Sequence, residues 1–228
     1  MKNLIFTIVL LITLNLFSQK GKVIYTAHLA ENATDNEVLE STNSDSNDVE
    51  CELIFNKNKS RFKTIKKLNV TSINITSIKI PRGVYYYDKK ETVSQQKIIG
   101  ETYIVTLNKV DWEFSNETKI IDGYYCKKAT TIKTSEGPKG IIKKNVMVWY
   151  APEIPLNFGP LNYNGLPGLV LYLQIGNLSF SATNINLNPK DEISIDIPKE
   201  EKHITEKEKI ILIKEFFHKR RKNNRKRK

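Results

Sequence analysis

The chain has 228 residues, of which 39% are hydrophobic and 27% are charged, and its net charge is +11. Beyond the N-terminus no segment is long and apolar enough to span a membrane, and two cysteines allow a single intramolecular disulfide. The composition therefore gives no candidate for a membrane-spanning helix beyond the N-terminus and allows no disulfide framework larger than one bond.

The N-terminus carries a targeting signal. A lysine at position 2 precedes the apolar segment Leu4 to Phe17, and this order is typical of a secretory signal peptide. We assign residues 1–19 to the signal peptide, which predicts export to the periplasm or the medium. The remaining 209 residues (228 minus 19) are enough for one domain with a real core.

Short segments rich in β-branched and aromatic residues then alternate with polar turns. They predict strands at 22–30, 50–56, 60–64, 68–80, 84–87, 101–107, 112–115, 124–131, 141–150, 169–173 and 178–187. Residues 31–50 hold seven acids and no base, and they are predicted to form a flexible acidic loop. The fold class is therefore mainly β: a curved antiparallel sheet or half-barrel meander with a C-terminal helix. The strand order is similar to the curved sheets of periplasmic lipoprotein carriers, a similarity that concerns shape alone.

The most constrained segment lies between Phe158 and Leu173. Five of its residues are predicted to shape turns, with a type II turn at Leu166–Leu169 in which glycine takes the positive φ; the five are Gly159, Pro160, Gly165, Pro167 and Gly168. From Asn145 to Pro189 the sequence has one charged residue, Glu153. The depletion is explained either by burial or by an apolar groove that binds a partner.

Two motifs carry a resemblance to a known family. IPLNFGPLNYNGLPGLVL at 154–171 and the upstream VWYAPEIP at 148–155 resemble the signature of the GLPGLI family of exported Bacteroidetes proteins, and so does KIIDGYYCKKA at 119–129. Val170 stands where the family name has isoleucine. The resemblance implies an exported protein and carries no established activity, cofactor or substrate.

The C-terminal part, residues 199–228, is predicted to be a helix followed by a basic tail, after a sheet domain at 20–198. Thr205 and Glu208 have the spacing of a capping box, and Ile210, Ile213 and Phe217 follow on one helical face. The tail carries eight bases without an acid: Lys219, Arg220, Arg221, Lys222, Arg225, Lys226, Arg227 and Lys228. Export makes nucleic acid an unexpected partner, and an anionic membrane surface or another polyanion is the better candidate.

The sequence contains no motif for metal binding, cofactor binding or nucleophilic catalysis. Asp111 with Glu113, or Glu153 alone, has the chemistry for acid–base work, so an enzyme stays open as an alternative. Cys51 and Cys126 are predicted either to pair as a disulfide or to be two small buried side chains.

Three functions remain from these observations. The leading hypothesis is a non-catalytic envelope protein that binds an apolar ligand or a protein partner through Tyr150, Glu153, Phe158 and Tyr163. The alternatives are binding of a polyanion or anionic membrane surface through the basic tail, and a hydrolase whose site is assembled from distant residues. We predict no cofactor and no metal.

Overall fold

The computed structural model describes residues 20–29, 49–67, 81, 83–137 and 140–225. The predicted signal peptide, most of the acidic loop and the predicted strand at 68–80 lie outside these residues. Val49, which we assigned to the acidic loop, begins a strand instead, and Glu50, which we placed in both the loop and the following strand, lies in that strand.

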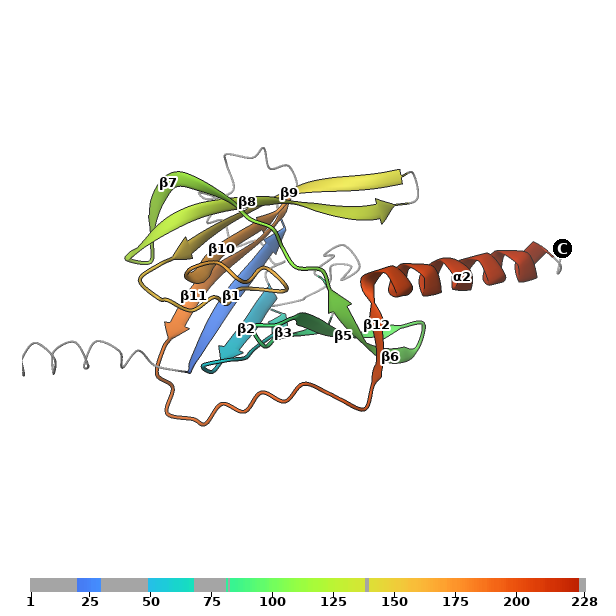
Figure 1. The fold of residues 1–228 in the computed structure, drawn as a ribbon, viewed down its shortest axis with the longest axis horizontal. Coiled ribbons are helices and arrows are strands. Elements are labelled where there is room, and N and C mark those ends of the chain that lie inside the picture. The colour runs from blue at the N-terminus through green and yellow to red at the C-terminus, as the bar shows by residue number, and fades with distance from the viewer. Residues whose placement is uncertain (1–19, 30–48, 68–80, 82, 138–139, 226–228) are drawn as a thin grey trace, which may run out of the picture.

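Twelve strands form one open sheet, which confirms the predicted mainly β class (Figure 1). The order across the sheet is β12-β6-β5-β4-β3-β2-β1-β11-β10-β9-β8-β7. All neighbours are antiparallel except β12 and β6, which are parallel. The strands are β1 (Gly21–Leu29), β2 (Val49–Phe55), β3 (Ser60–Lys67), β4 (Val84–Tyr87), β5 (Thr92–Ile98), β6 (Glu101–Leu107), β7 (Glu113–Ile121), β8 (Tyr124–Gly137), β9 (Gly140–Ala151), β10 (Leu169–Ile175), β11 (Leu178–Asn186) and β12 (Lys202–Thr205).

Two strands were not predicted. The sequence of β5, TVSQQKI, is too polar to read as a strand, yet β5 pairs with both β4 and β6. The four-residue β12 lies inside the segment assigned to the helix and tail, so the sheet domain extends past residue 198 to Thr205.

The main core lies on one face of the sheet. Alternate residues of β1 (Val23, Tyr25 and Ala27) are buried there, as the period of two in a strand requires. In β10 all seven residues are buried, so this apolar strand is covered on both faces, and burial accounts for the lack of charge in it. A smaller cluster on the opposite face of β2 and β4–β6 packs against Ile193, Ile195 and Ile197, in the segment that runs from β11 to β12.

The one helix among the described residues, α2 (Glu206–Arg225), follows β12 and extends away from the sheet (Figure 1). The predicted capping box is present: the Glu208 amide donates to Thr205 Oγ1 at 3.2 Å, and the Thr205 amide donates to Glu208 Oε2 at 2.6 Å. No helix among the described residues is long and apolar enough to cross a membrane.

Candidate binding surface

The loop between β9 and β10 fills the core of the curved sheet. Phe158 is fully buried, stacks on Phe55 with ring centroids 5.3 Å apart and meets Tyr87 edge-on at 6.0 Å. Tyr163 is also buried, and desolvation raises the pKa of its hydroxyl. Phe158 and Tyr163 therefore serve the interior packing and do not line an open surface.

The other two predicted binding residues lie closer to the surface. Tyr150 is buried but touches the ring of Phe114, which is 62% exposed at the edge of the sheet. Glu153 accepts a hydrogen bond from the Tyr125 amide at 3.2 Å, so its carboxylate helps to hold the loop against β8. The structure thus separates the four predicted binding residues into an interior pair and a pair near the sheet edge.

The glycines of the loop work differently from the prediction. The glycine with a positive φ is Gly165, at 84°, whereas Gly168 is not in the left-handed region, so the predicted type II turn at Leu166–Leu169 is wrong. A Cβ on Gly168 would lie 2.4 Å from the carbonyl oxygen of Ala151. Gly159 has the same constraint, because its Cβ would lie 2.1 Å from the Tyr163 carbonyl oxygen. Close backbone contact, rather than turn geometry, requires glycine at both positions.

The loop that contains the prolines is held to β10 by backbone hydrogen bonds. The Val170 amide donates to the Phe158 carbonyl at 3.0 Å, and the Tyr163 amide donates to the Pro160 carbonyl at 3.1 Å. Tyr25 of β1 donates from its hydroxyl to the Val170 carbonyl at 2.6 Å, so β1 also holds this corner. Pro167 directly precedes the tightly packed Gly168.

Both cysteines are free and buried, so the disulfide alternative does not hold in this structure. Burial raises the pKa of both thiols to about 11. At neutral pH they are protonated and poorly nucleophilic, and they act as small apolar side chains.

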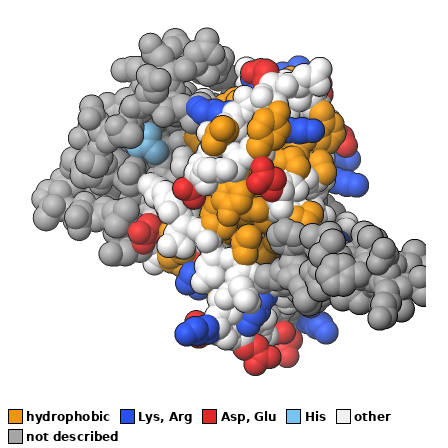
Figure 2. All heavy atoms as spheres, turned by 90° about the vertical axis from the view of Figure 1, so that its left-hand side faces the viewer, with side chains coloured by type: hydrophobic (Ala, Val, Ile, Leu, Met, Phe, Trp, Pro, Cys, Tyr) orange, Lys and Arg blue, Asp and Glu red, His pale blue; other side chains and the backbone are white. Residues whose placement is uncertain are grey.

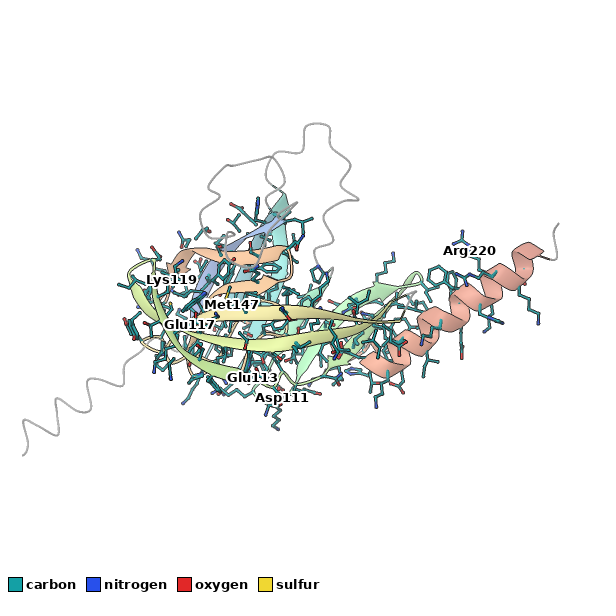
Figure 3. The ribbon with its side chains drawn as sticks, turned by 90° about the horizontal axis from the view of Figure 1, so that it is seen from above. Asp111, Glu113, Glu117, Lys119, Met147 and Arg220 are labelled. Carbon is teal, nitrogen blue, oxygen red and sulfur yellow. The ribbon has the colours of Figure 1, made fainter. Side chains whose placement is uncertain are left out.

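The acidic candidates for catalysis lie at the start of β7. Asp111 and Glu113 are both exposed, and Figure 3 shows them on the rim formed by β7 and the connection that precedes it. Among the described residues no group of three His, Cys, Asp or Glu side chains is placed to hold a metal ion.

Large exposed hydrophobic residues gather in two projections. The first is the arm, residues 132–137 of β8 and 140–145 of β9, which extends beyond the ends of β7 and β10. The second is α2, which lies on the same side of the molecule (Figure 1). Of eleven large exposed hydrophobics among the described residues, six lie here: Ile132, Ile141, Ile142, Ile211, Phe216 and Phe217. Seen from the opposite end, the molecule has apolar patches interrupted by charged and polar groups (Figure 2).

A cleft of about 480 Å³ lies between the arm and α2, and we call it the arm–helix cleft. Ile210, Ile213 and Phe217 line it from one helical face, as the sequence period predicts. Glu136 closes it from the arm through an ion pair with Lys214. His218 and Arg221 complete the rim, so the cleft has an apolar wall and a largely basic border.

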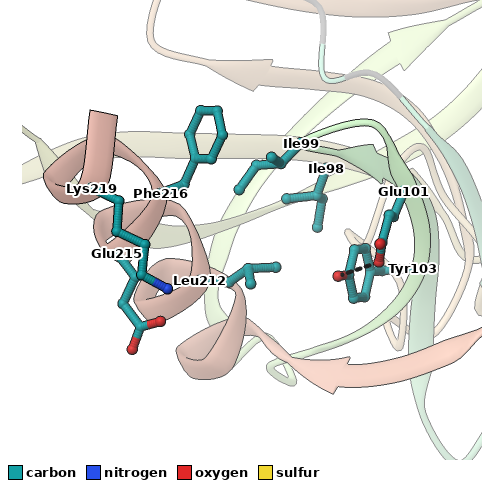
Figure 4. A pocket seen from close by; sticks show the side chains of 8 residues that line it. All are labelled: Ile98, Ile99, Glu101, Tyr103, Leu212, Glu215, Phe216 and Lys219. Carbon is teal, nitrogen blue, oxygen red and sulfur yellow. Dashed lines mark hydrogen bonds between the residues drawn. The ribbon is translucent and has the colours of Figure 1, made fainter. Parts of the chain in front are cut away.

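A second, smaller pocket of about 220 Å³ lies on the other side of α2 (Figure 4). Leu212 and Phe216 line it from the helix, and Ile98 and Ile99 line it from the β5–β6 turn. On its border Tyr103 donates a hydrogen bond to Glu101, which also pairs with Lys202 at 2.7 Å. The hydrogen bonds from Lys202 and then from Tyr103 lower the pKa of Glu101. Leu212 and Ile213 pack against the cluster of Ile98, Tyr103 and Val105, and this packing holds the first half of α2 on the sheet. The helix residues from Lys214 to Asn223 are exposed.

Sequence reasoning missed the arm because two long adjacent strands look like ordinary parts of a meander. Two features mark the arm. Isoleucines 132, 141 and 142 are exposed, and β8 and β9 extend beyond the ends of the strands that pair with them. The second feature depends on which strands pair and where the pairing ends, and this cannot be read from the sequence.

The family model described as "Protein of unknown function (Porph_ging)" matches residues 138–172. These residues cover β9, the loop between β9 and β10 (the central loop) and the start of β10. Two solved structures of PNGF-II, in different space groups, are similar in fold, with TM-scores of 0.51 and 0.52 and identities of 18% and 20%. The likeness covers 86% of this chain but only about a third of PNGF-II, 32% and 33%. No curated protein matches the sequence.

Proposed function

We propose that this chain is an exported, non-catalytic envelope protein of the GLPGLI type that binds an apolar ligand, or an apolar part of a partner, in the arm–helix cleft. The proposal moves the binding role away from the interior residues Phe158 and Tyr163. Export rests on the N-terminal segment 1–19, and the family assignment rests on the motifs around residues 119–129 and 148–171.

The observation that carries the proposal is the unfilled apolar face of α2. Ile210, Ile213 and Phe217 line a cleft large enough for part of a small ligand, and Phe217 is 52% exposed. Contiguous exposed apolar surface of this kind marks interaction sites in soluble proteins. The arm lines the cleft through Glu136, so the apolar surface offered to a ligand or partner is that of the helix.

Binding of a neutral fluorescent probe, N-phenyl-1-naphthylamine, tests the cleft. We expect saturable binding by the purified protein and a loss of about fivefold or more in affinity for Phe217→Ser, because a buried aromatic ring contributes at least that much. Ile120→Ser is the control, since Ile120 is 71% exposed beside the β7–β8 turn, at the other end of β8 from the arm.

Thermal unfolding of both variants checks that the fold is intact. Absence of saturable binding by the unmodified protein, or an equal loss in both variants, contradicts the proposal.

A further inference from the structure

We infer that α2 docks on an anionic lipid surface, with Phe216 and Phe217 entering the apolar layer and the bases after them contacting the headgroups. The inference deepens the proposed function, because it names the source of the apolar ligand.

The exposed half of the helix needs an environment to stabilise it. From Lys214 to Asn223 every residue is exposed, and an ion pair of Lys214 with Glu136 joins this half of the helix to the arm. An unsupported helix of this length is only marginally stable in water, since tertiary packing supplies most helical stability. A surface that covers the distal half would therefore stabilise it.

Charge decides which kind of surface fits. Between residues 206 and 225 the sequence has eight Lys and Arg and three Glu, a net charge of +5 (8 minus 3), and the three residues after it are Lys226, Arg227 and Lys228. A second copy of the chain placed against α2 would bring two strongly positive segments together, which is unfavourable. The occupant must be acidic.

The distribution of the bases favours a diffuse anionic layer over one acidic patch on a folded protein. Lys219, Arg220, Arg221 and Lys222 are consecutive, so at 3.6 residues per turn they surround the helix. A flat protein interface would neutralise one side and leave the others unpaired. Headgroups of a lipid surface accommodate positive charge on several sides of a helix end.

Exposed aromatic residues separate a lipid surface from a soluble polyanion. Phe216 and Phe217 are separated from the basic segment by His218 alone, are 37% and 52% exposed, and contact each other edge-on. Phenylalanine next to bases is the composition of interfacial helices, in which the ring enters the acyl boundary while the charges stay at the headgroups. An acidic polysaccharide would bind the bases but has no apolar layer for the phenylalanine rings to enter. The arm reaches the same side, with exposed Ile141 at its tip.

Cosedimentation with vesicles tests the inference. We expect the purified protein to bind vesicles containing about 30% phosphatidylglycerol in phosphatidylcholine and to bind pure phosphatidylcholine weakly. The variant Arg220→Gln/Arg221→Gln/Lys222→Gln should weaken binding roughly a hundredfold, because each base near an anionic surface contributes roughly fivefold. The matched control Lys57→Gln/Lys90→Gln/Lys190→Gln removes the same charge from exposed positions on other loops and should leave binding within about twofold.

The double variant Phe216→Ser/Phe217→Ser distinguishes an anionic lipid surface from a soluble polyanion. It should weaken binding to the anionic vesicles several-fold and leave binding to dextran sulfate unchanged. Vesicle binding that is insensitive to the base variant, or equally sensitive to its control, overturns the inference. Dextran sulfate binding as strong as vesicle binding, with no effect of the phenylalanines, overturns the lipid assignment in favour of a general polyanion.

The two proposals fail separately. If the naphthylamine probe binds the cleft and the vesicles do not bind, the lipid inference is wrong and the proposed function stands. If vesicles bind and the probe does not, the cleft is wrong and docking through the helix end stands.

Discussion

Glycine at positions 159 and 168 shows how one missing side chain sets the course of a loop. At both positions a backbone carbonyl occupies the space that a Cβ would need. The contact brings the end of the loop against Ala151 at the end of β9, so that Leu169 can begin β10 beside it. Such a contact requires glycine more strictly than a turn does. The opposing atom belongs to the backbone and cannot rotate away from an added Cβ.

Replacement of Gly168 measures this requirement. Gly168→Ala should lower the free energy of unfolding by about 2–3 kcal/mol, because the added methyl group must displace backbone in a packed core. Gly123→Ala is the comparison, since Gly123 has a positive φ of 79° with open space around it, and the left-handed strain alone should cost about 1 kcal/mol. Urea unfolding of both variants gives the two values. A smaller loss at Gly168 than at Gly123 contradicts the interpretation.

Among the elements, the sheet edge at β7 is protected against further pairing. β7 is the last strand in the order and is mostly exposed, yet its pairing with β8 is irregular between Phe114 and Thr118. Glu113, Glu117 and Lys119 add charges along it. Bulges and charges are the usual devices that keep an edge strand from pairing with another chain. The exposed apolar residues of this edge therefore make a poorer interaction site than the arm and α2.

The start of α2 depends on its cap. Hydrogen bonds from the Thr205 amide and hydroxyl lower the pKa of Glu208. A lowered pKa means that the carboxylate stabilises the folded cap above its ordinary pKa, and that this contribution is lost as the pH falls through the lowered value.

Thr205→Ala should therefore cost about 1 kcal/mol of helix stability and weaken the acid dependence of the helical signal. Far-ultraviolet circular dichroism across an acid titration measures both. Ser115→Ala, on exposed β7, serves as a control that should leave the titration unchanged. An identical titration of the Thr205 variant and the unmodified protein contradicts the role of the cap.

At the scale of the whole molecule, the central loop joins the two halves of the curved sheet. Phe158 packs on Phe55 of β2 and Tyr87 of β4, while its carbonyl accepts from Val170 of β10. Asn164 extends the connection to β5, through its amide and Thr92 Oγ1 at 3.1 Å. Contacts from β2, β4, β5 and β10 converge on one loop, so the sheet should unfold as a unit.

Phe158→Ala tests this unity. Removal of a fully buried ring should cost about 3–5 kcal/mol and shift the whole transition without splitting it. Phe114→Ala, at an exposed position, should change stability by no more than about 0.5 kcal/mol. Denaturant unfolding followed by tryptophan fluorescence and by circular dichroism shows whether the transition stays single. A loss of stability in the Phe158 variant no larger than that in the Phe114 variant contradicts the role of the loop as the joint between the halves.

Local patterns predicted much of this fold. Alternating apolar residues identified most strands, and the spacing of Thr205 and Glu208 placed the start of α2, because strand period and helix capping depend on residues close in sequence. The lack of charge around 169–173 predicted a covered strand for the same reason: an ionised side chain cannot be buried there without a partner.

Only the tertiary structure decided the remainder. The polar strand β5 forms because β4 and β6 lie on either side of it, and Gly168 is required because Ala151 comes close to it. The same holds for Phe158, which became core rather than binding surface, and for the arm, which is exposed because neighbouring strands end early. By itself the sequence determined most of the strands and the start of the helix; the contacts between distant segments determined the polar strand β5 and which side chains stay accessible, because burial depends on what packs against a residue from elsewhere in the chain.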